Sequence, residues 1–293
     1  MAHVAGTFSG PRGVDIFWQS WLPDGAPKGV VLLVHGLGEH SGRYTNVVHR
    51  LVPEGYAVYA LDHMGHGQSQ GAREVIHTFE DLTEPLWQFR QQVVPRHSGV
   101  PTFLLGHSMG GLIASLHALE HAEGLSGLVL SAPAVYVGEG VSALTIAMGK
   151  ILSVVAPQVG VLPVRPEFVS RDPVVVAAYS NDPLVFHKKT PARLAAELLR
   201  SINGLGPRLQ DMQLPLLVMQ GTADRLVDPK GASWFVESVS SADKTLTTYA
   251  GLYHEIFNEP EHAEVIGDLL GWLRQRTEPS RLLGRGQGDS AGQ

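Results

Sequence analysis

Ser108 lies between two glycines in the segment GHSMG, residues 106–110. The apolar run before it, residues 101–105 (PTFLL), predicts a short buried strand, and residues 112–119 (LIASLHAL) predict a helix. The segment matches the G-x-S-x-G pattern, in which a tight strand-to-helix turn exposes a serine hydroxyl. Glycines suit such a turn because they lack the Cβ atoms that would clash there. We interpret Ser108 as a candidate nucleophile, although an inert serine in a turn of small residues is the alternative.

A serine nucleophile needs a base that accepts its proton and a carboxylate that orients the base. On a parallel sheet these groups lie at the carboxyl ends of strands. Asp224 follows the predicted strand 216–219 (LLVM), and His254 follows the predicted strand 245–249 (TLTTY). The order serine, acid, histidine fits the same fold pattern. Asp228 competes as the acid, but its position before a proline favours a turn or a helix cap.

Two main-chain donors must also face the oxygen that becomes charged during the reaction. Met109, the residue after the nucleophile, is expected to supply one of them. The segment HGLG, residues 35–38, follows the apolar run 30–34, and Leu37 is expected to supply the other. Considered alone, HGLG could equally be an ordinary turn at the end of a strand.

The composition bounds the class of protein. The chain has 293 residues, of which 44% are hydrophobic and 17% are charged, enough for one large α/β domain or two small ones. The net charge of -6 without a basic block argues against nucleic acid as a partner. The absence of cysteine excludes disulfides, thiol nucleophiles and thiolate metal sites. No secretory signal and no run of about 18 apolar residues are recognisable, so a cytoplasmic location is expected.

Short apolar runs alternate with helix-like stretches, which predicts a parallel sheet with helices on both faces. The run at 14–21 predicts an early antiparallel strand, and the more polar strand at 245–249 is expected nearer the sheet edge. The predicted strands are 14–21, 30–34, 57–61, 102–105, 128–130, 216–219 and 245–249, and the predicted helices lie near 41–54, 80–95, 110–121, 230–240 and 260–275.

The interval from about residue 137 to residue 207 interrupts the alternation because it contains no clear strand. Within it, residues 141–156 (VSALTIAMGKILSVVA) are almost wholly apolar, with Lys150 as the only charge. This stretch predicts either a core helix or a cap helix whose apolar face lines a substrate passage or touches lipid. The expected parts of the chain are a first core part at 1–136, a cap at 137–207, a second core part at 208–278 and a flexible tail at 279–293.

Other histidines raise the question of a metal. His117 and His121 fit the pattern H-x-x-E-H, and two histidines four apart on a helix can share a metal. No third ligand stands out, however, and the helix should carry this pair away from the serine. We therefore expect neither a metal nor a cofactor. The remaining histidines are expected in structural roles: His63 and His66 in the tight loop DHMGHG, His35 in a hydrogen-bonded loop, and His262 exposed at the start of the last helix.

Several stretches together resemble the monoacylglycerol lipases, a family of α/β-hydrolases. The likeness extends over about residues 14–276. Many hydrolases share GHSMG, whereas the combination of HGxGEHSGRY with ADRL and YHE is far more specific. The stretches are HGLGEHSGRY (35–44), ALDHMGHGQSQG (60–71), GHSMGG (106–111), YSNDPLV (179–185), QGTADRLVDPKG (220–231) and GLYHEIFNEPE (251–261).

The resemblance implies an α/β-hydrolase fold with a cap inserted after the sixth strand, and a role for eight residues. The implied nucleophile, acid and base are Ser108, Asp224 and His254, the implied oxyanion donors are Leu37 and Met109, and the residues implied near a glycerol head group are Glu39, Arg43 and Tyr179. From the residues alone, Glu39 and Arg43 could equally form a surface ion pair, and Tyr179 could simply pack in the cap. The animal enzymes carry alanine in place of Leu37 and cysteine in place of Val227, which bears on pocket shape.

The expected activity is hydrolysis of monoacylglycerols to glycerol and fatty acid through an acyl-enzyme. Each buried methylene contributes about 0.8 kcal/mol, so the acyl chain of such a single-chain lipid ester supplies most of the affinity. Polar groups around the head supply the discrimination. Transient contact of the cap with a membrane surface is also expected. The alternatives are a broad carboxylesterase or lysophospholipase with the same triad, and a hydrolase-fold receptor with little turnover.

Overall fold

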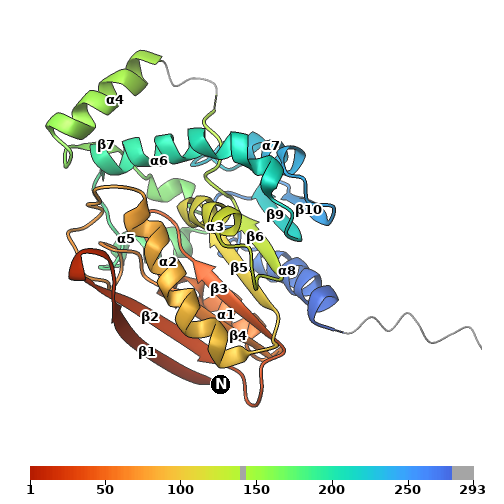
Figure 1. Cartoon of the computed structure of the whole chain (residues 1–293). Coiled ribbons are helices and arrows are strands. Elements are labelled where there is room, and N and C mark those ends of the chain that lie inside the picture. The colour runs from red at the N-terminus through yellow and green to blue at the C-terminus, as the bar shows by residue number, and fades with distance from the viewer. Residues whose placement is uncertain (139–142, 279–293) are drawn as a thin grey trace, which may run out of the picture.

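The computed structural model describes residues 1–138 and 143–278. The expected tail at 279–293 lies outside these ranges, as do the first two residues of the apolar stretch at 141–156. Eight strands form one sheet in the order β1-β2-β4-β3-β5-β6-β9-β10 (Figure 1). The strands from β4 to β10 run parallel, whereas β2 is antiparallel to both of its neighbours. The expected fold class is therefore confirmed.

The bounds of the elements follow the predicted alternation. The strands are β1 (Ala2–Ser9), β2 (Asp15–Leu22), β3 (Gly29–Val34), β4 (Tyr56–Leu61), β5 (Thr102–His107), β6 (Gly127–Ser131), β7 (Gly160–Leu162), β8 (Thr190–Pro191), β9 (Leu216–Gly221) and β10 (Lys244–Tyr249). The α-helices are α1 (Thr45–Leu51), α2 (Glu80–Val93), α3 (Met109–Glu120), α4 (Ala143–Val155), α5 (Pro173–Asn181), α6 (Ala192–Leu205), α7 (Lys230–Ser238) and α8 (His262–Thr277). Short 3-10 helices lie at Pro11–Gly13, Ser41–Tyr44, Val94–His97, Pro166–Phe168 and Gly206–Asp211.

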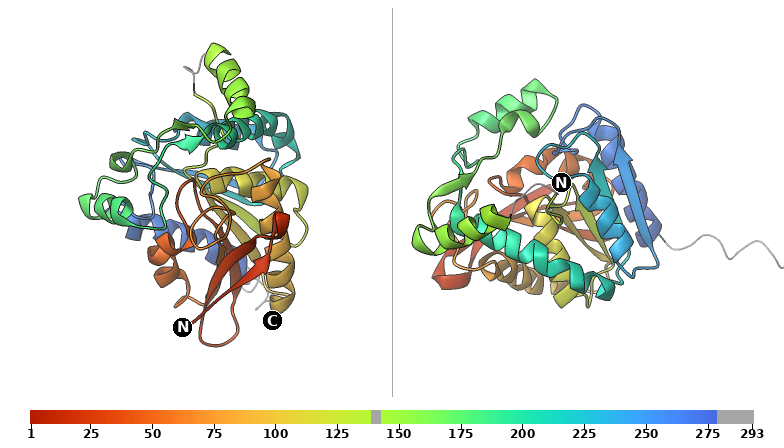
Figure 2. Two further views of the ribbon diagram at one scale, coloured as in Figure 1. Left: turned by 90° about the vertical axis from the view of Figure 1, so that its left-hand side faces the viewer. Right: turned by 90° about the horizontal axis from the view of Figure 1, so that it is seen from above.

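Helices cover both faces of the sheet, so the central strands are apolar along their whole length (Figure 2). On β3, the side chains of Val30, Leu32 and Val34 pack in one cluster with α2, α3 and α7. The alternate residues Val31 and Leu33 pack in a second cluster with α1 and α8. This double burial fixes the register of the strands and therefore the level at which each strand ends.

Two features differ from the prediction. The strand β1, Ala2–Ser9, was not expected, because most of its residues are exposed and give no apolar period. It forms because every residue pairs with β2 at the antiparallel edge of the sheet. The interval expected to lack strands contains β7 and β8, which form a separate two-stranded sheet. The strand β10 does lie at the opposite edge, as its polar character predicted.

In the connection from β6 to β9, residues 132–215, the described parts 132–138 and 143–215 form a layer above the carboxyl ends of the strands (Figure 1). We call this segment the cap. Within it, α4 packs on α6, and α6 packs on α3 of the core. Figure 2 shows α4 on the outer side of α6, away from the sheet. The proposed cap limits of 137 and 207 stay a prediction. Within the described ranges, no helix combines the length and apolar character needed to cross a bilayer.

Candidate active site

Ser108 occupies a strained turn between β5 and α3. Its φ of 53° and ψ of -121° lie outside the regions that a side chain prefers. The turn is held by the Ser108 N–H, which donates to the Ser131 carbonyl at 3.0 Å. A Cβ at Gly110 would lie 2.1 Å from the Val34 carbonyl oxygen, and one at Gly106 would lie 2.4 Å from the carbonyl oxygen of Gly110. The two glycines are therefore required by close backbone contacts, as the sequence predicted.

Asp224 and His254 come together from the loops that follow β9 and β10. The His254 Nδ1–H donates to Asp224 Oδ2 at 2.8 Å, and Gln220 Nε2 donates to the same oxygen at 3.0 Å. The other oxygen, Oδ1, accepts the N–H groups of Leu226 at 2.8 Å and Val227 at 3.1 Å. With four donors the carboxylate has one fixed orientation. It therefore keeps the proton on Nδ1 and leaves Nε2 able to accept one.

The charges around this pair favour a protonated histidine. Burial by itself would lower the pKa of His254, but the carboxylates of Asp224, Glu255 and Glu39 outweigh it and raise the pKa above 6.5. Burial would likewise raise the pKa of Asp224, but His254 and the hydrogen bonds to its carboxylate hold that pKa below its usual value. The pair is thus arranged to stabilise the imidazolium that forms when His254 accepts a proton.

Ser108 and His254 open into one cavity of about 890 Å³, which lies between the core and the cap. Leu37 and Met109 line the same cavity. Among the described residues, neither of their main-chain N–H groups donates a hydrogen bond within the protein. The structure thus brings together all five residues for which the resemblance implied catalysis. Apolar side chains form much of the far wall, from α6 (Ala195, Leu198, Leu199, Ile202), from the segment around β7 (Val161, Leu162, Val164) and from the loop after Asp224 (Leu226, Val227).

Glu39 holds the HGLG turn in place. Its Oε1 accepts the Gly36 N–H at 2.6 Å and the Tyr44 hydroxyl at 2.5 Å. Its Oε2 lies 3.4 Å from Arg43 Nε. Burial and the nearby carboxylate of Glu255 raise the pKa of Glu39. The pair of Glu39 and Arg43 is buried, so the surface ion pair considered from the sequence is wrong.

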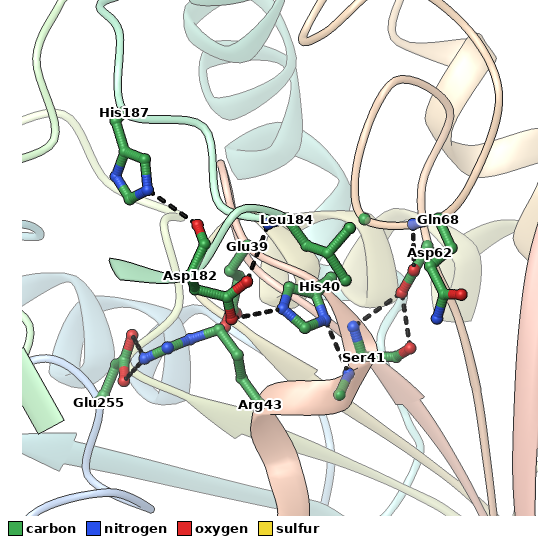
Figure 3. A network of polar contacts seen from close by, with 12 residues as sticks. Glu39, His40, Ser41, Arg43, Asp62, Gln68, Asp182, Leu184, His187 and Glu255 are labelled. Carbon is green, nitrogen blue, oxygen red and sulfur yellow. Dashed lines mark hydrogen bonds and ion pairs between the residues drawn. The ribbon is translucent and has the colours of Figure 1, made fainter. Parts of the chain in front are cut away.

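Arg43 lies beside the carboxylates of Glu39 and Glu255 (Figure 3) and against the ring of Tyr179. Its Nη2 donates to both oxygens of Glu255 at 2.9 and 2.6 Å, and its guanidinium lies 4.7 Å from the ring centroid of Tyr179. Glu39, Tyr179 and Glu255 line the large cavity, whereas Arg43 lies behind them. The expected head-group residues thus form one cluster, but only two of the three reach the cavity wall. One cation faces two carboxylates there, so the cluster offers no uncompensated positive charge.

The pair His117 and His121 is engaged by other groups. Arg90 Nη1 lies 3.2 Å from His117 Nε2, and the His121 ring stacks on Trp87 at 3.9 Å between centroids. Burial and the Arg90 charge lower the pKa of His117 to about 3. A cation beside the histidine opposes a metal ion at the same place. Across the described ranges, no cluster of three or more histidine and acidic side chains has the geometry of a metal site.

The other histidines hold loops together. His35 donates from Nδ1 to the Gly36 carbonyl at 2.8 Å and accepts the His63 N–H at Nε2 at 2.9 Å. Burial lowers the pKa of His63 to about 3 and that of His66 to about 4, so both are uncharged at neutral pH. The structural roles expected for these three residues are confirmed. His262, by contrast, is half-buried rather than exposed, because its Nδ1 contacts the Glu259 carbonyl.

The competing acid Asp228 shapes a turn. Its Oδ1 accepts the Lys230 N–H at 3.0 Å, just where α7 begins. Sequence reasoning did not single out Glu255 or Gln220 as site residues, although both lie in the motif stretches that carry the resemblance. It also missed His107, whose ring lies 4.8 Å from that of His254. Position next to a catalytic residue was the available signal for His107 and Glu255.

Comparison with known proteins agrees with this geometry. The family profile described as "Serine aminopeptidase, S33" matches residues 25–261. Monoacylglycerol lipase of Mycolicibacterium smegmatis is 43% identical over 91% of this chain and 95% of the relative. Human monoglyceride lipase is 37% identical over 90% of this chain and 88% of the relative. The crystal structure of Paleococcus ferrophilus monoacylglycerol lipase is 30% identical, with a TM-score of 0.78 over 94% of this chain and 100% of that one. The chain therefore belongs to the α/β-hydrolases and, among them, to the family of the monoacylglycerol lipases.

Proposed function

We propose that this protein hydrolyses monoacylglycerols to glycerol and a free fatty acid. The observation that carries the proposal is the cavity shared by Ser108 on its strained turn and by the hydrogen-bonded pair of His254 and Asp224. The cavity is near the upper end of the roughly 300–1,000 Å³ range of small-molecule sites. It joins an apolar wall, suited to an acyl chain, to a polar end beside the serine.

The reaction proceeds through an ester of the serine. Ser108 Oγ attacks the substrate carbonyl carbon while His254 Nε2 accepts the hydroxyl proton. The N–H groups of Leu37 and Met109 donate to the resulting oxyanion. The bond to glycerol then breaks, and protonated His254 donates its proton to the departing oxygen. Water repeats the sequence and releases the fatty acid, while Asp224 keeps the histidine oriented throughout.

The polar end of the cavity favours a neutral alcohol. Tyr179, Glu39 and Glu255 can bind hydroxyl groups, and Arg43 is already neutralised by the two carboxylates. A phosphate on the leaving group would meet these carboxylates, and Arg43 would not be free to pair with it. This placement supports a glycerol ester over a lysophospholipid, the alternative that the sequence left open.

A panel of esters tests the proposal. We expect monooleoylglycerol to be hydrolysed with a kcat/KM well above that of lysophosphatidylcholine, lysophosphatidic acid and dioleoylglycerol. Ser108→Ala should abolish both this activity and covalent labelling by a fluorophosphonate. Equal rates on all four lipids would support a broad esterase instead, and labelling without turnover of any ester would support a receptor.

We further propose that the outer face of α4 contacts a membrane while the substrate enters. Met148, Ile151, Val154 and Val155 on this face are each 62–77% exposed. Val159, just beyond the helix, is also exposed. Proteins rarely leave so much contiguous apolar surface in water without an interaction that covers it. Single-chain lipids are supplied from membranes and micelles. We therefore propose that a membrane surface covers the apolar face of α4.

A further inference from the structure

The cap holds the loop that carries His254 at both neighbouring residues. On one side, the Glu255 N–H donates to the Val169 carbonyl of the cap at 2.7 Å. On the other side, the Tyr253 N–H donates to Glu259 Oε1 at 3.0 Å. The main chain on either side of His254 is thus hydrogen-bonded, on one side to a cap carbonyl and on the other to a buried carboxylate.

That carboxylate is itself fixed by the cap. Glu259 is fully buried, and it accepts the Arg171 N–H at 3.0 Å and Arg171 Nε at 2.8 Å. Arg171 also pairs with Glu261 on the same loop. A buried carboxylate without a cation carries a large desolvation cost, so Glu259 depends on Arg171 to keep its position. Loss of the arginine would therefore disturb the hydrogen bond to Tyr253.

The same part of the cap holds the turn that carries Leu37. The Phe186 N–H donates to the Gly38 carbonyl at 2.8 Å. His40 Nε2 donates to Asp182 Oδ2 at 2.9 Å, because His40 Nδ1 already accepts a main-chain N–H (Figure 3). Asp182 is kept in place by the Leu184 N–H, which donates to its other oxygen at 2.8 Å.

Residues 168–187, which contain α5, therefore contact both loops of the site. We propose that this segment is a fixed brace, and that Arg171 and Asp182 in it are positioning residues for His254 and for the Leu37 N–H respectively. The proposal rests on the catalytic roles given above. A displacement of about 1 Å in such a site can lower the rate by about 10²-fold, so small shifts of either loop are sufficient to affect catalysis.

The test uses the full chain and two esters. p-Nitrophenyl butyrate does not fill the acyl cavity, whereas monooleoylglycerol does. We expect Arg171→Ala to lower kcat by about 10- to 100-fold on both esters, with KM within about twofold of the starting value. Arg171→Lys should restore part of the rate, since it keeps a cation beside Glu259.

Asp182→Asn tests the second contact without removing a side chain. We expect slower labelling of Ser108 by a fluorophosphonate and a lower kcat on both esters. Arg208→Ala supplies the matched control, because Arg208 is a cap arginine that pairs with Glu120 on α3 and does not line the cavity. This control should leave kcat unchanged.

Three other outcomes would contradict the proposal that residues 168–187 position the two loops. A lower melting temperature with unchanged kcat per folded molecule would make Arg171 a purely structural residue. A loss confined to monooleoylglycerol would make the segment part of substrate binding. Effects no larger than those of Arg208→Ala would remove the positioning role altogether. A failure of the proposed function is recognised separately, because the original chain would then show no preference for monooleoylglycerol over the other three lipids.

Discussion

Glu74 is a buried carboxyl group that nothing in the described structure compensates. It is 1% exposed, and neither of its oxygens accepts a hydrogen bond. Its backbone has a φ of 55°, and its Oε1 lies against Gly38, where an added Cβ would be 3.1 Å away. Burial raises the pKa of Glu74 from 4.5 to about 8, with only the nearby Thr190 hydroxyl opposing the shift. Tyr179 is the titratable group that faces it from α5.

The raised pKa makes stability depend on pH in a defined direction. Between pH 4.5 and about 8 the folded chain holds the proton and the unfolded chain has lost it. The contribution of Glu74 to stability is therefore greatest below pH 4.5, falls as the pH rises, and stops falling above about pH 8. Each unit is equivalent to about 1.4 kcal/mol, so this group lowers the free energy of unfolding by roughly 4 kcal/mol between about pH 5 and pH 8. Such a change is a large part of the total stability of about 5–15 kcal/mol.

Glu74→Gln removes the titration and keeps the shape of the side chain. We expect urea unfolding curves at several pH values to show the variant gaining about 4 kcal/mol relative to the original chain between about pH 5 and pH 8. The comparison uses the change with pH, so a constant offset from the new amide does not affect it. Glu84→Gln, at an exposed position on α2, is the control. Its free energy of unfolding should change with pH in parallel with that of the original chain. Parallel curves for Glu74→Gln would refute the reasoning.

Three further predictions concern the site and the cap. Asp224→Asn should lower kcat by about 10⁴ while the fold persists, and Asp228→Asn should have little effect; a larger loss at Asp228 would show that the acid is misassigned. The kcat/KM should rise with pH through a midpoint above 6.5, because neutral His254 is the base and its pKa is raised, and a midpoint below 6.5 would contradict the electrostatics. Replacing Ile151 and Val155 by serine should weaken binding to phospholipid vesicles without slowing p-nitrophenyl butyrate hydrolysis, whereas a large fall in melting temperature would show that this face is buried.

The central fold could be predicted because its strands are buried on both faces. Double burial gives uninterrupted apolar runs such as residues 30–34, and these runs are visible without any knowledge of the neighbours. The strand β1 has no such signal, since its residues are mostly exposed and its stability comes from pairing with β2. The strand β1 forms only because it pairs with β2, and the residues of β1 alone do not indicate that pairing.

The proximity of the residues that we propose for catalysis was predictable for a related reason. Ser108, Asp224 and His254 each follow a recognisable strand, so the topology of a parallel sheet brings them to one edge. The residues that hold them were not predictable in this way. Arg171 and Glu259 are 88 positions apart, and each is an ordinary charged residue until the cap folds onto the histidine loop. Only burial distinguishes Glu259 from any exposed glutamate.

The carboxylates of Glu39 and Glu255 affect both the pKa of His254 and the charge at the alcohol end of the cavity. Glu39 and Glu255 raise the pKa of His254 and so make it a stronger base. The same carboxylates pair with Arg43, so this cation is not free to bind an anionic head group. A site built for an anionic head group would need that cation, and a cation left free beside His254 would lower the pKa of the histidine. The same two carboxylates thus add to the effect of Asp224 on the pKa of His254 and support the proposed preference for a neutral alcohol.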